Sequence, residues 1–169
     1  MIESALLGFS HGTGIHGFMN SAWGWPLVES LHFLGLSLLI GTIGVFDLRM
    51  LGIAKGVSMA ALHKLVPYGV GGYVLNVTTG TMFVSSEPGE YLYNPAFQTK
   101  MLFMAGAGIN MLVFYRTTMA SVRTVNDGGD APSRAKLIAG ISLACWLGVI
   151  TCGRLITYYR PPYHWCFWC

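Results

Sequence analysis

Long apolar runs separated by short polar stretches dominate the hydrophobic pattern of this chain. Four runs are long enough to cross a bilayer: residues 27–49, 60–85, 95–115 and 133–159. A helix rises about 1.5 Å per residue, so about 20 residues cover the roughly 30 Å hydrocarbon core. The pattern predicts an all-α fold, in which a single domain, residues 1–169, forms an integral membrane bundle of four helices.

The two ends of the chain have a different pattern. Residues 1–24 mix apolar positions with glycines and two histidines, which predicts a segment lying in the membrane interface. This segment lacks the features of a secretory signal, so we expect the chain to begin at its mature end. Residues 160–169 form a tail in which Cys166 and Cys169 have Cys-x-x-Cys spacing, typical of a disulfide or two free thiols more than of a metal site.

Composition supports a membrane protein and argues against nucleic acid as a partner. Hydrophobic residues make up 53% of the chain and charged residues 10%, against roughly 25% charged in an average soluble domain. The net charge of +3 forms no basic stripe with interleaved aromatic residues. The lipid bilayer is therefore the expected surrounding.

Charge asymmetry between the connections predicts the orientation. The second connection carries Glu87 and Glu90, whereas basic residues flank the first and the third, and such residues favour the cytoplasmic side. They are Arg49, Lys55, Lys64, Arg116, Arg123, Arg134 and Lys136. We therefore expect both termini on the outer side. At the inner edge, Asp47 and Arg49 end the first helix where His63 and Lys64 begin the second, which predicts structural salt bridges.

Ionisable residues inside the expected spans form the candidate site. His32, Lys100 and Arg154 each lie five residues from the outer end of their helix, which is roughly 7 to 8 Å below the boundary, and Glu29 lies one turn shallower. One interpretation is an ion-pair lock that fixes the helix order. The other is a ligand site, because the two cations exceed the single carboxylate and suit an anionic ligand.

Haem b is the first cofactor to consider for this site. His32 is a candidate iron ligand, and Lys100 and Arg154 are candidate partners for the propionates. Met82, Met101 and Met104 are candidate axial or copper ligands, since thioether and imidazole bind soft Cu(I), although methionines in apolar helices also pack without binding metal. Quinone binding at the level of His32 fits the same residues.

A set of residues in the first three spans resembles a known pattern. It comprises Trp25-Pro26-Leu27, Glu29, His32, Gly35, Gly41, Asp47-Leu48-Arg49, Leu51-Gly52, Thr79-Gly80, Phe83, Tyr91, Asn94-Pro95, Phe97 and Lys100. This pattern is similar to that of a bacterial family of small four-helix integral membrane proteins without an assigned function. More distantly, the plan resembles the cytochrome b561 and copper-resistance D membrane domains. The resemblance implies the bacterial inner membrane, with the outer side periplasmic, and haem or copper chemistry near that side.

The sequence therefore favours a small b-type haem protein or subunit in membrane electron transfer. Two alternatives remain open. One is a structural or accessory subunit of a larger membrane complex, since glycines in the second and third helices suit contacts with partner helices. The expected protein partners are other membrane subunits or, in a homo-oligomer, further copies of this chain. The other is a copper-handling protein. No nucleophile with a base is recognisable, so we expect an electron-transfer or accessory role more than a stand-alone enzyme.

Overall fold

The computed structural model describes residues 2–53, 55–125 and 128–159. All secondary-structure elements assigned within these ranges are helices, which confirms the all-α prediction. The tail of residues 160–169, with Cys166 and Cys169, lies outside the described residues.

The first long helical stretch combines three consecutive elements. These are α3 (Gly24–Leu39), the π-helix η1 (Ile40–Gly44) and α4 (Val45–Leu51). α4 ends at Gly52, whose φ of 93° is the left-handed conformation that glycine adopts readily at a helix C-terminus. The sequence pattern predicted one helix here but not its π-helical turn, which widens the backbone in the middle of the stretch.

The second apolar run, expected at 60–85, is divided into two helices. α5 (Met59–His63) is capped by Ser58, whose Oγ accepts a hydrogen bond from the backbone N–H of Ala61 at 3.1 Å. α6 (Val66–Ser86) then begins with Pro67 in its first turn. Proline lacks the N–H needed to continue an earlier helix, and this accounts for the break.

The second half of the chain supplies two further long helices. α7 (Pro88–Leu92) leads into α8 (Pro95–Thr117), which Asn94 caps by accepting from the N–H of Ala96 at 3.0 Å. α10 (Ser133–Leu155) ends in a short 3-10 turn, η2 (Ile156–Tyr158). The connection between α8 and α10 contains the short helix α9 (Met119–Arg123).

Three helical stretches in the described residues are long and apolar enough to cross a membrane. They are Gly24–Leu51, Pro95–Thr117 and Ser133–Tyr158. α6 has 21 residues and no charged side chain, but its glycine, threonine and asparagine residues lower its hydropathy. Three of the four expected spans thus correspond to helices that are long and apolar enough to cross a membrane.

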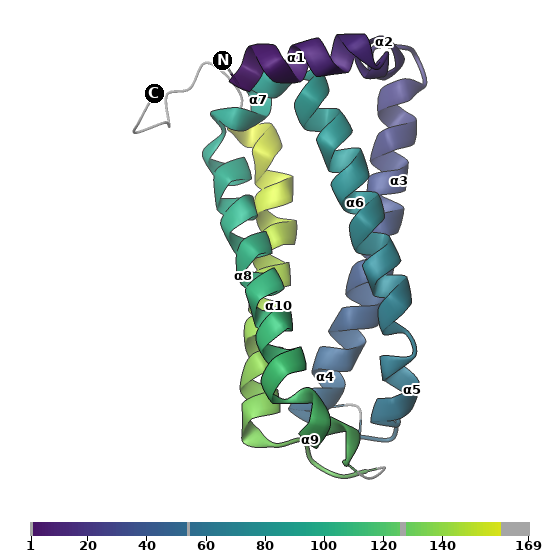
Figure 1. The fold of residues 1–169 in the computed structure, drawn as a ribbon, viewed down its shortest axis with the longest axis vertical. Helices are drawn as coiled ribbons and strands as arrows, with labels where there is room; N and C mark the ends of the chain where they lie inside the picture. The colour runs from purple at the N-terminus through teal and green to yellow at the C-terminus, as the bar shows by residue number, and fades with distance from the viewer. Residues whose placement is uncertain (1, 54, 126–127, 160–169) are drawn as a thin grey trace.

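The long helices are arranged as two pairs. α3 packs along α6, and α8 packs along α10, while α4 joins the pairs by packing against α10 (Figure 1). α1 (Ile2–Gly12) and α2 (Ile15–Met19) lie across one end of the bundle, as an interfacial segment would (Figure 1). We call this the α1 end, and we call the opposite end, where α5 and α9 lie, the α9 end.

Close backbone contact holds α3 against α6. A Cβ atom on Gly72 would lie 2.6 Å from the carbonyl oxygen of Gly35, and one on Gly35 would lie 2.9 Å from that of Gly72. Only glycine fits at both positions, and this is the small-residue packing by which helices associate in membranes. The seam fixes which side chains of the two helices face each other.

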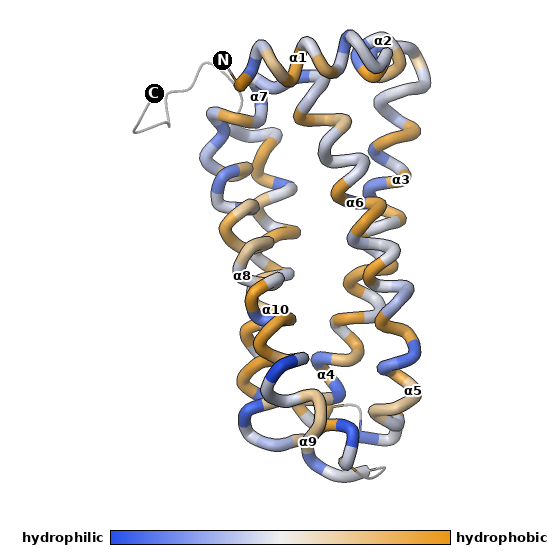
Figure 2. The backbone as a smooth tube through the Cα atoms, in the orientation of Figure 1, coloured by the Kyte–Doolittle hydropathy of each residue, from blue (hydrophilic) through white to orange (hydrophobic). Residues whose placement is uncertain are grey.

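The two ends of the bundle differ in composition. The main cluster of buried apolar residues lies toward the α9 end, where Phe46, Met50 and Phe114 pack with residues of α5, α9 and α10. Figure 2 shows hydrophobic residues along the long helices and hydrophilic residues gathered around α9. There Asp130 pairs with Lys55 at 3.0 Å and with Lys136 at 3.2 Å, so the first and third connections meet.

Candidate functional site

His32 lies half-buried on α3 and is held by a side chain of α6. Its Nδ1 atom is 2.7 Å from the Oγ1 atom of Thr79, which is itself buried. The Thr79 hydroxyl lies 2.7 Å from the carbonyl oxygen of Leu75, to which it donates its one proton. Thr79 must therefore accept from Nδ1–H of His32, and this leaves the Nε2 lone pair of a neutral imidazole free to bind a ligand.

Aromatic packing fixes the plane of the His32 ring. Phe83 meets it edge-on, with the ring centroids 5.7 Å apart and the planes at 72°. Trp25 packs against Phe83 in turn, with a centroid distance of 5.0 Å. A Cβ atom on Gly80 would stand only 3.8 Å from Cε1 of His32, so a small residue adjoins the ring. The imidazole therefore has one defined orientation.

Lys100 is the cation that interacts electrostatically with this imidazole. It is half-buried on α8, and its Nζ atom lies 3.9 Å from the position that a Cβ atom on Gly153 of α10 would take. Its positive charge lies within electrostatic range of His32 and of Cys152. The structure thus brings together His32 and Lys100, one from each helix pair.

The other two expected members of the site lie on the surface. Glu29 and Arg154 are both exposed, and within the described part of the chain neither forms a salt bridge. The expected ion-pair lock among Glu29, Lys100 and Arg154 is therefore not formed there. Counting residues from the helix ends predicted a depth for each residue but could not predict the direction in which its side chain points.

The three candidate methionines are spread over different surroundings. Met101 is 38% exposed on α8, Met82 is half-buried on α6, and Met104 lines a cavity farther along the bundle. No group of three or more His, Cys, Asp or Glu side chains in the described residues is arranged to hold a metal ion.

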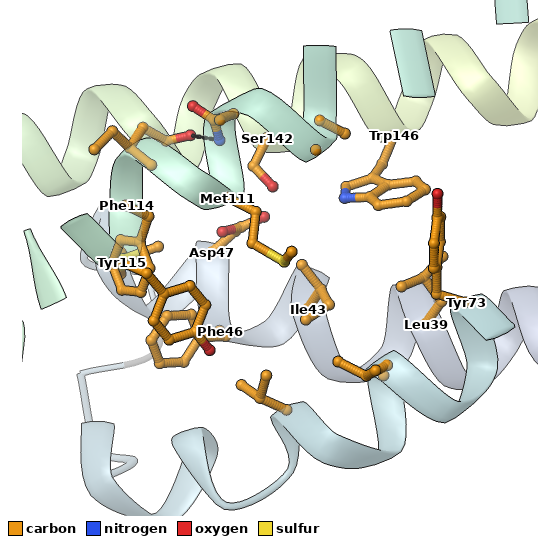
Figure 3. A pocket seen from close by; sticks show the side chains of 18 of the residues that line it. Leu39, Ile43, Phe46, Asp47, Tyr73, Met111, Phe114, Tyr115, Ser142 and Trp146 are labelled. Atoms are coloured by element: carbon orange, nitrogen blue, oxygen red, sulfur yellow. Dashed lines mark hydrogen bonds between the residues drawn. The ribbon is translucent and has the colours of Figure 1, made fainter. Parts of the chain in front are cut away.

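The cavity is a feature that the sequence did not reveal. It has a volume of about 190 Å³ and lies between the two helix pairs, beside the π-helix η1. Phe46 and Phe114 meet edge-on at 5.7 Å on one side of it, and Tyr73 and Trp146 meet at 6.4 Å on another. Figure 3 shows these rings around the cavity, with Asp47 among them.

Asp47 contributes the carboxyl group of this cavity. It is 3% exposed, and its Oδ2 atom has no hydrogen-bond partner in the described structure. The Ser142 hydroxyl of α10 lies within hydrogen-bonding reach of the carboxyl group, and Figure 3 shows the two side chains turned toward each other. Ser142 was not identified from the sequence, because one serine in an apolar helix carries no distinctive signal.

Arg49, two residues farther along α4, faces a different region. Fully buried, it donates from Nε to the carbonyl oxygen of Val57 at 2.7 Å and from Nη1 to that of Gly129 at 3.2 Å. The expected salt bridges among Asp47, Arg49, His63 and Lys64 are not formed within the described residues; at this end of the bundle the ion pairs are those of Asp130 with Lys55 and Lys136. Backbone carbonyls of two loops take the place of a carboxylate.

A second hollow lies at the α9 end. Its lining includes His63 and Lys64 from the α5 region and Arg123 from α9. The Nε2 atom of His63 is buried without a partner among the described residues. The ring packs edge-on to Phe46 and Tyr115, each at 6.3 Å, which keeps it within the aromatic cluster.

Comparison with known proteins gives no relative of this chain. No family model, curated protein or solved structure matches it. The geometry of the residues alone therefore supports the function proposed below.

Proposed function

We propose that this protein is a b-type haem protein, or a haem-bearing subunit, that takes part in electron transfer within a membrane. The observation that carries this proposal is the hydrogen bond between Nδ1 of His32 and Thr79, which leaves Nε2 with a free lone pair. Histidines that bind metals almost always donate their other ring N–H to a fixed acceptor, which sets the tautomer and the ring orientation.

The surroundings of His32 suit the group chemically. Phe83 and Trp25 provide flat apolar surface beside the imidazole, and Lys100 provides a nearby positive charge for a propionate. Helix bundles hold cofactors between facing helices in this manner. A bound haem would supply a one-electron carrier, while His32 would ligate the iron through Nε2 and Lys100 would orient an acidic edge.

The proposed setting is the bacterial inner membrane, with the α1 end on the periplasmic side. The support is the charge distribution, because Arg49, Lys55, Arg123 and Lys136 gather at the α9 end while Glu87 lies near the α1 end. We further propose that α6 is the fourth span, since its 21 residues run along α3 and correspond to about 31 Å of helix.

The test is an absorption spectrum of the protein purified from its native membrane. We expect a Soret band that is lost in His32→Ala and kept in His63→Ala, the matched control at the α9 end. A pyridine haemochrome assay quantifies the haem independently of activity. A colourless wild-type protein with no haem in this assay contradicts the proposal, as does a Soret band that His32→Ala leaves intact.

A second variant tests the role of Lys100. Lys100→Gln preserves much of the side-chain length and removes the charge, so haem affinity should fall while the position of the Soret band stays unchanged. Arg154→Gln is the comparison, because Arg154 is exposed. Equal affinities in Lys100→Gln and wild type would remove Lys100 from the proposed site.

An accessory-subunit role is the second candidate, and one face of α8 favours it. Gly108 is exposed, and a Cβ atom there would meet nothing within 4 Å. In α6, by contrast, Gly69 and Gly72 already pack against the first long helical stretch. Native electrophoresis of solubilised membranes tests this role: a lone monomer that keeps full activity contradicts it.

A further inference from the structure

The cavity beside Asp47 opens toward the faces of α6 and α8. Among its lining residues, the exposed ones all come from these two helices: Val70, Tyr73, Gly108, Met111 and Tyr115. α8 belongs to a stretch apolar enough to cross a membrane. In a bilayer, such exposed apolar faces meet lipid. A molecule dissolved in the membrane therefore has a lateral route into the cavity.

The size of the cavity fits a single ring. Its volume is about 190 Å³, and an engineered apolar cavity of about 150 Å³ binds benzene. Aromatic side chains from three different helices, Phe46, Tyr73 and Trp146, surround the space. A substituted aromatic ring would pack edge-on or offset against these walls.

Two acceptors in the cavity favour a ligand that donates a hydrogen bond. Asp47 contributes a buried carboxyl group with an unpartnered oxygen. Asn110 uses its side-chain N–H to donate to the carbonyl oxygen of Ile138 at 3.0 Å, so its own amide oxygen remains an acceptor. No Lys, Arg or His side chain is among the described lining residues. Leaving the buried oxygen without a donor costs about 1–3 kcal/mol.

We propose that this cavity binds the ring of a lipid-soluble phenol or hydroquinone, whose hydroxyl group donates a hydrogen bond to Asp47. A neutral hydroxyl is favoured over an ammonium group because the ligand enters past apolar residues such as Val70 and Met111, where a cation would lose its hydration. This inference goes beyond the haem proposal, because it concerns a different cavity and does not depend on His32.

The experiment measures equilibrium binding of decylphenol to the protein in lipid nanodiscs, with empty nanodiscs as the background. The methyl ether, decylanisole, has the same ring and chain but no donor, and we expect it to bind about tenfold more weakly. Asp47→Leu should remove this preference for the phenol. Equal binding of phenol and ether to wild type would overturn the proposal, and so would tighter binding of tetraphenylphosphonium than of decylphenol.

Two glycine variants test the location without altering Asp47. Gly108 lines the cavity and Gly140 does not, and a Cβ atom at either position meets nothing within 4 Å. Gly108→Leu should block the cavity and abolish saturable binding, whereas Gly140→Leu should bind as wild type does. Unchanged binding in Gly108→Leu would overturn the proposal.

Two further measurements separate the phenol proposal from the haem proposal and show whether the ligand is a phenol or a hydroquinone. His32→Ala should bind decylphenol as wild type does, even if haem is lost, so the two proposals can fail independently. Anaerobic titration with decylhydroquinone distinguishes the two kinds of ring. Tighter binding than decylphenol supports a hydroquinone as ligand, and equal binding supports a phenol.

Discussion

His32 and Asp47 occupy the same long helical stretch, on either side of the π-helix, and their surroundings are opposite. His32 has a fixed partner in Thr79 at 2.7 Å, whereas Asp47 is 3% exposed with one oxygen unpartnered. A satisfied imidazole offers one oriented lone pair, which suits a resident ligand. A partly satisfied carboxyl group is a destabilising feature in the absence of a ligand. His32 therefore belongs to a site whose geometry is already fixed, whereas Asp47 belongs to a site that still lacks a hydrogen-bond donor.

The seam between α3 and α6 creates the His32 site, so breaking the seam should have the largest effect. In Gly72→Leu the new side chain would start 2.6 Å from the carbonyl oxygen of Gly35. We expect the free energy of unfolding to fall by about 3 kcal/mol or more, because backbone atoms have no room to yield. Gly71→Leu is the control, since a Cβ atom there meets nothing within 4 Å. Thermal unfolding in detergent, followed by circular dichroism, checks this; similar melting of both variants would contradict it.

Removing the carboxyl group of Asp47, which has an unpartnered oxygen, should stabilise the folded protein. Asp47→Leu replaces a buried acid beside an apolar cavity, and we expect the free energy of unfolding to rise by about 1–2 kcal/mol. The free energy of unfolding should rise less in Asp47→Asn, because the buried amide group would still lack hydrogen-bond partners. A lower melting temperature for Asp47→Leu than for wild type would show that Asp47 has a stabilising partner in the folded protein.

Replacing Thr79, which accepts the hydrogen bond from His32, tests whether this bond orients the imidazole. Thr79→Val keeps the shape of the side chain but lets the imidazole turn, so stability should fall by about 1 kcal/mol and haem affinity by about 10–100-fold. Thr81→Val is the matched control, because Thr81 is exposed and donates only to Val77 of its own helix. Haem titration of the two variants measures the effect, and equal affinities would refute an orienting role for Thr79.

The surface ion pairs of Asp130 should have the smallest effect. Lys55 and Lys136 hold the pKa of this carboxyl below its usual value, mainly through hydrogen bonds. Because the pKa is lowered on folding, the contribution to stability is present above the unfolded value of about 4 and is lost as the pH falls through the lowered folded value. Asp130→Asn should abolish this part of the pH dependence, and added salt should weaken it in wild type. A pH profile identical in wild type and Asp130→Asn rules out a contribution from these contacts.

Much of the fold was predictable because hydropathy is a local property. The apolar runs at 95–115 and 133–159 correspond to α8 and to α10 with η2, within a few residues at each end. The first run corresponds to the stretch Gly24–Leu51. Pro67 gave a visible signal for a helix start, yet the turn before it was not anticipated, because the apolar run continues through it.

The candidate site was predicted less completely, and the reason is geometric. Sequence position predicted only a common depth for His32, Lys100 and Arg154, with Glu29 one turn shallower. Whether a side chain faces inward depends on the rotation of each helix about its axis, and about 100° separates successive residues. His32 and Lys100 are half-buried and interact electrostatically, whereas Glu29 and Arg154 are exposed.

The sequence by itself determined that this chain is helical and suited to a membrane, because long uncharged apolar runs have few other stable arrangements. It also determined that an imidazole lies within the first long helix. Only the tertiary structure decided that Thr79 fixes that imidazole and that Asp47 faces a cavity rather than Arg49. Both outcomes depend on the glycine seam and on the way α4 meets α10, which set the rotation of one helix against another. No local pattern encodes that rotation, since it follows from the fit of whole helix surfaces.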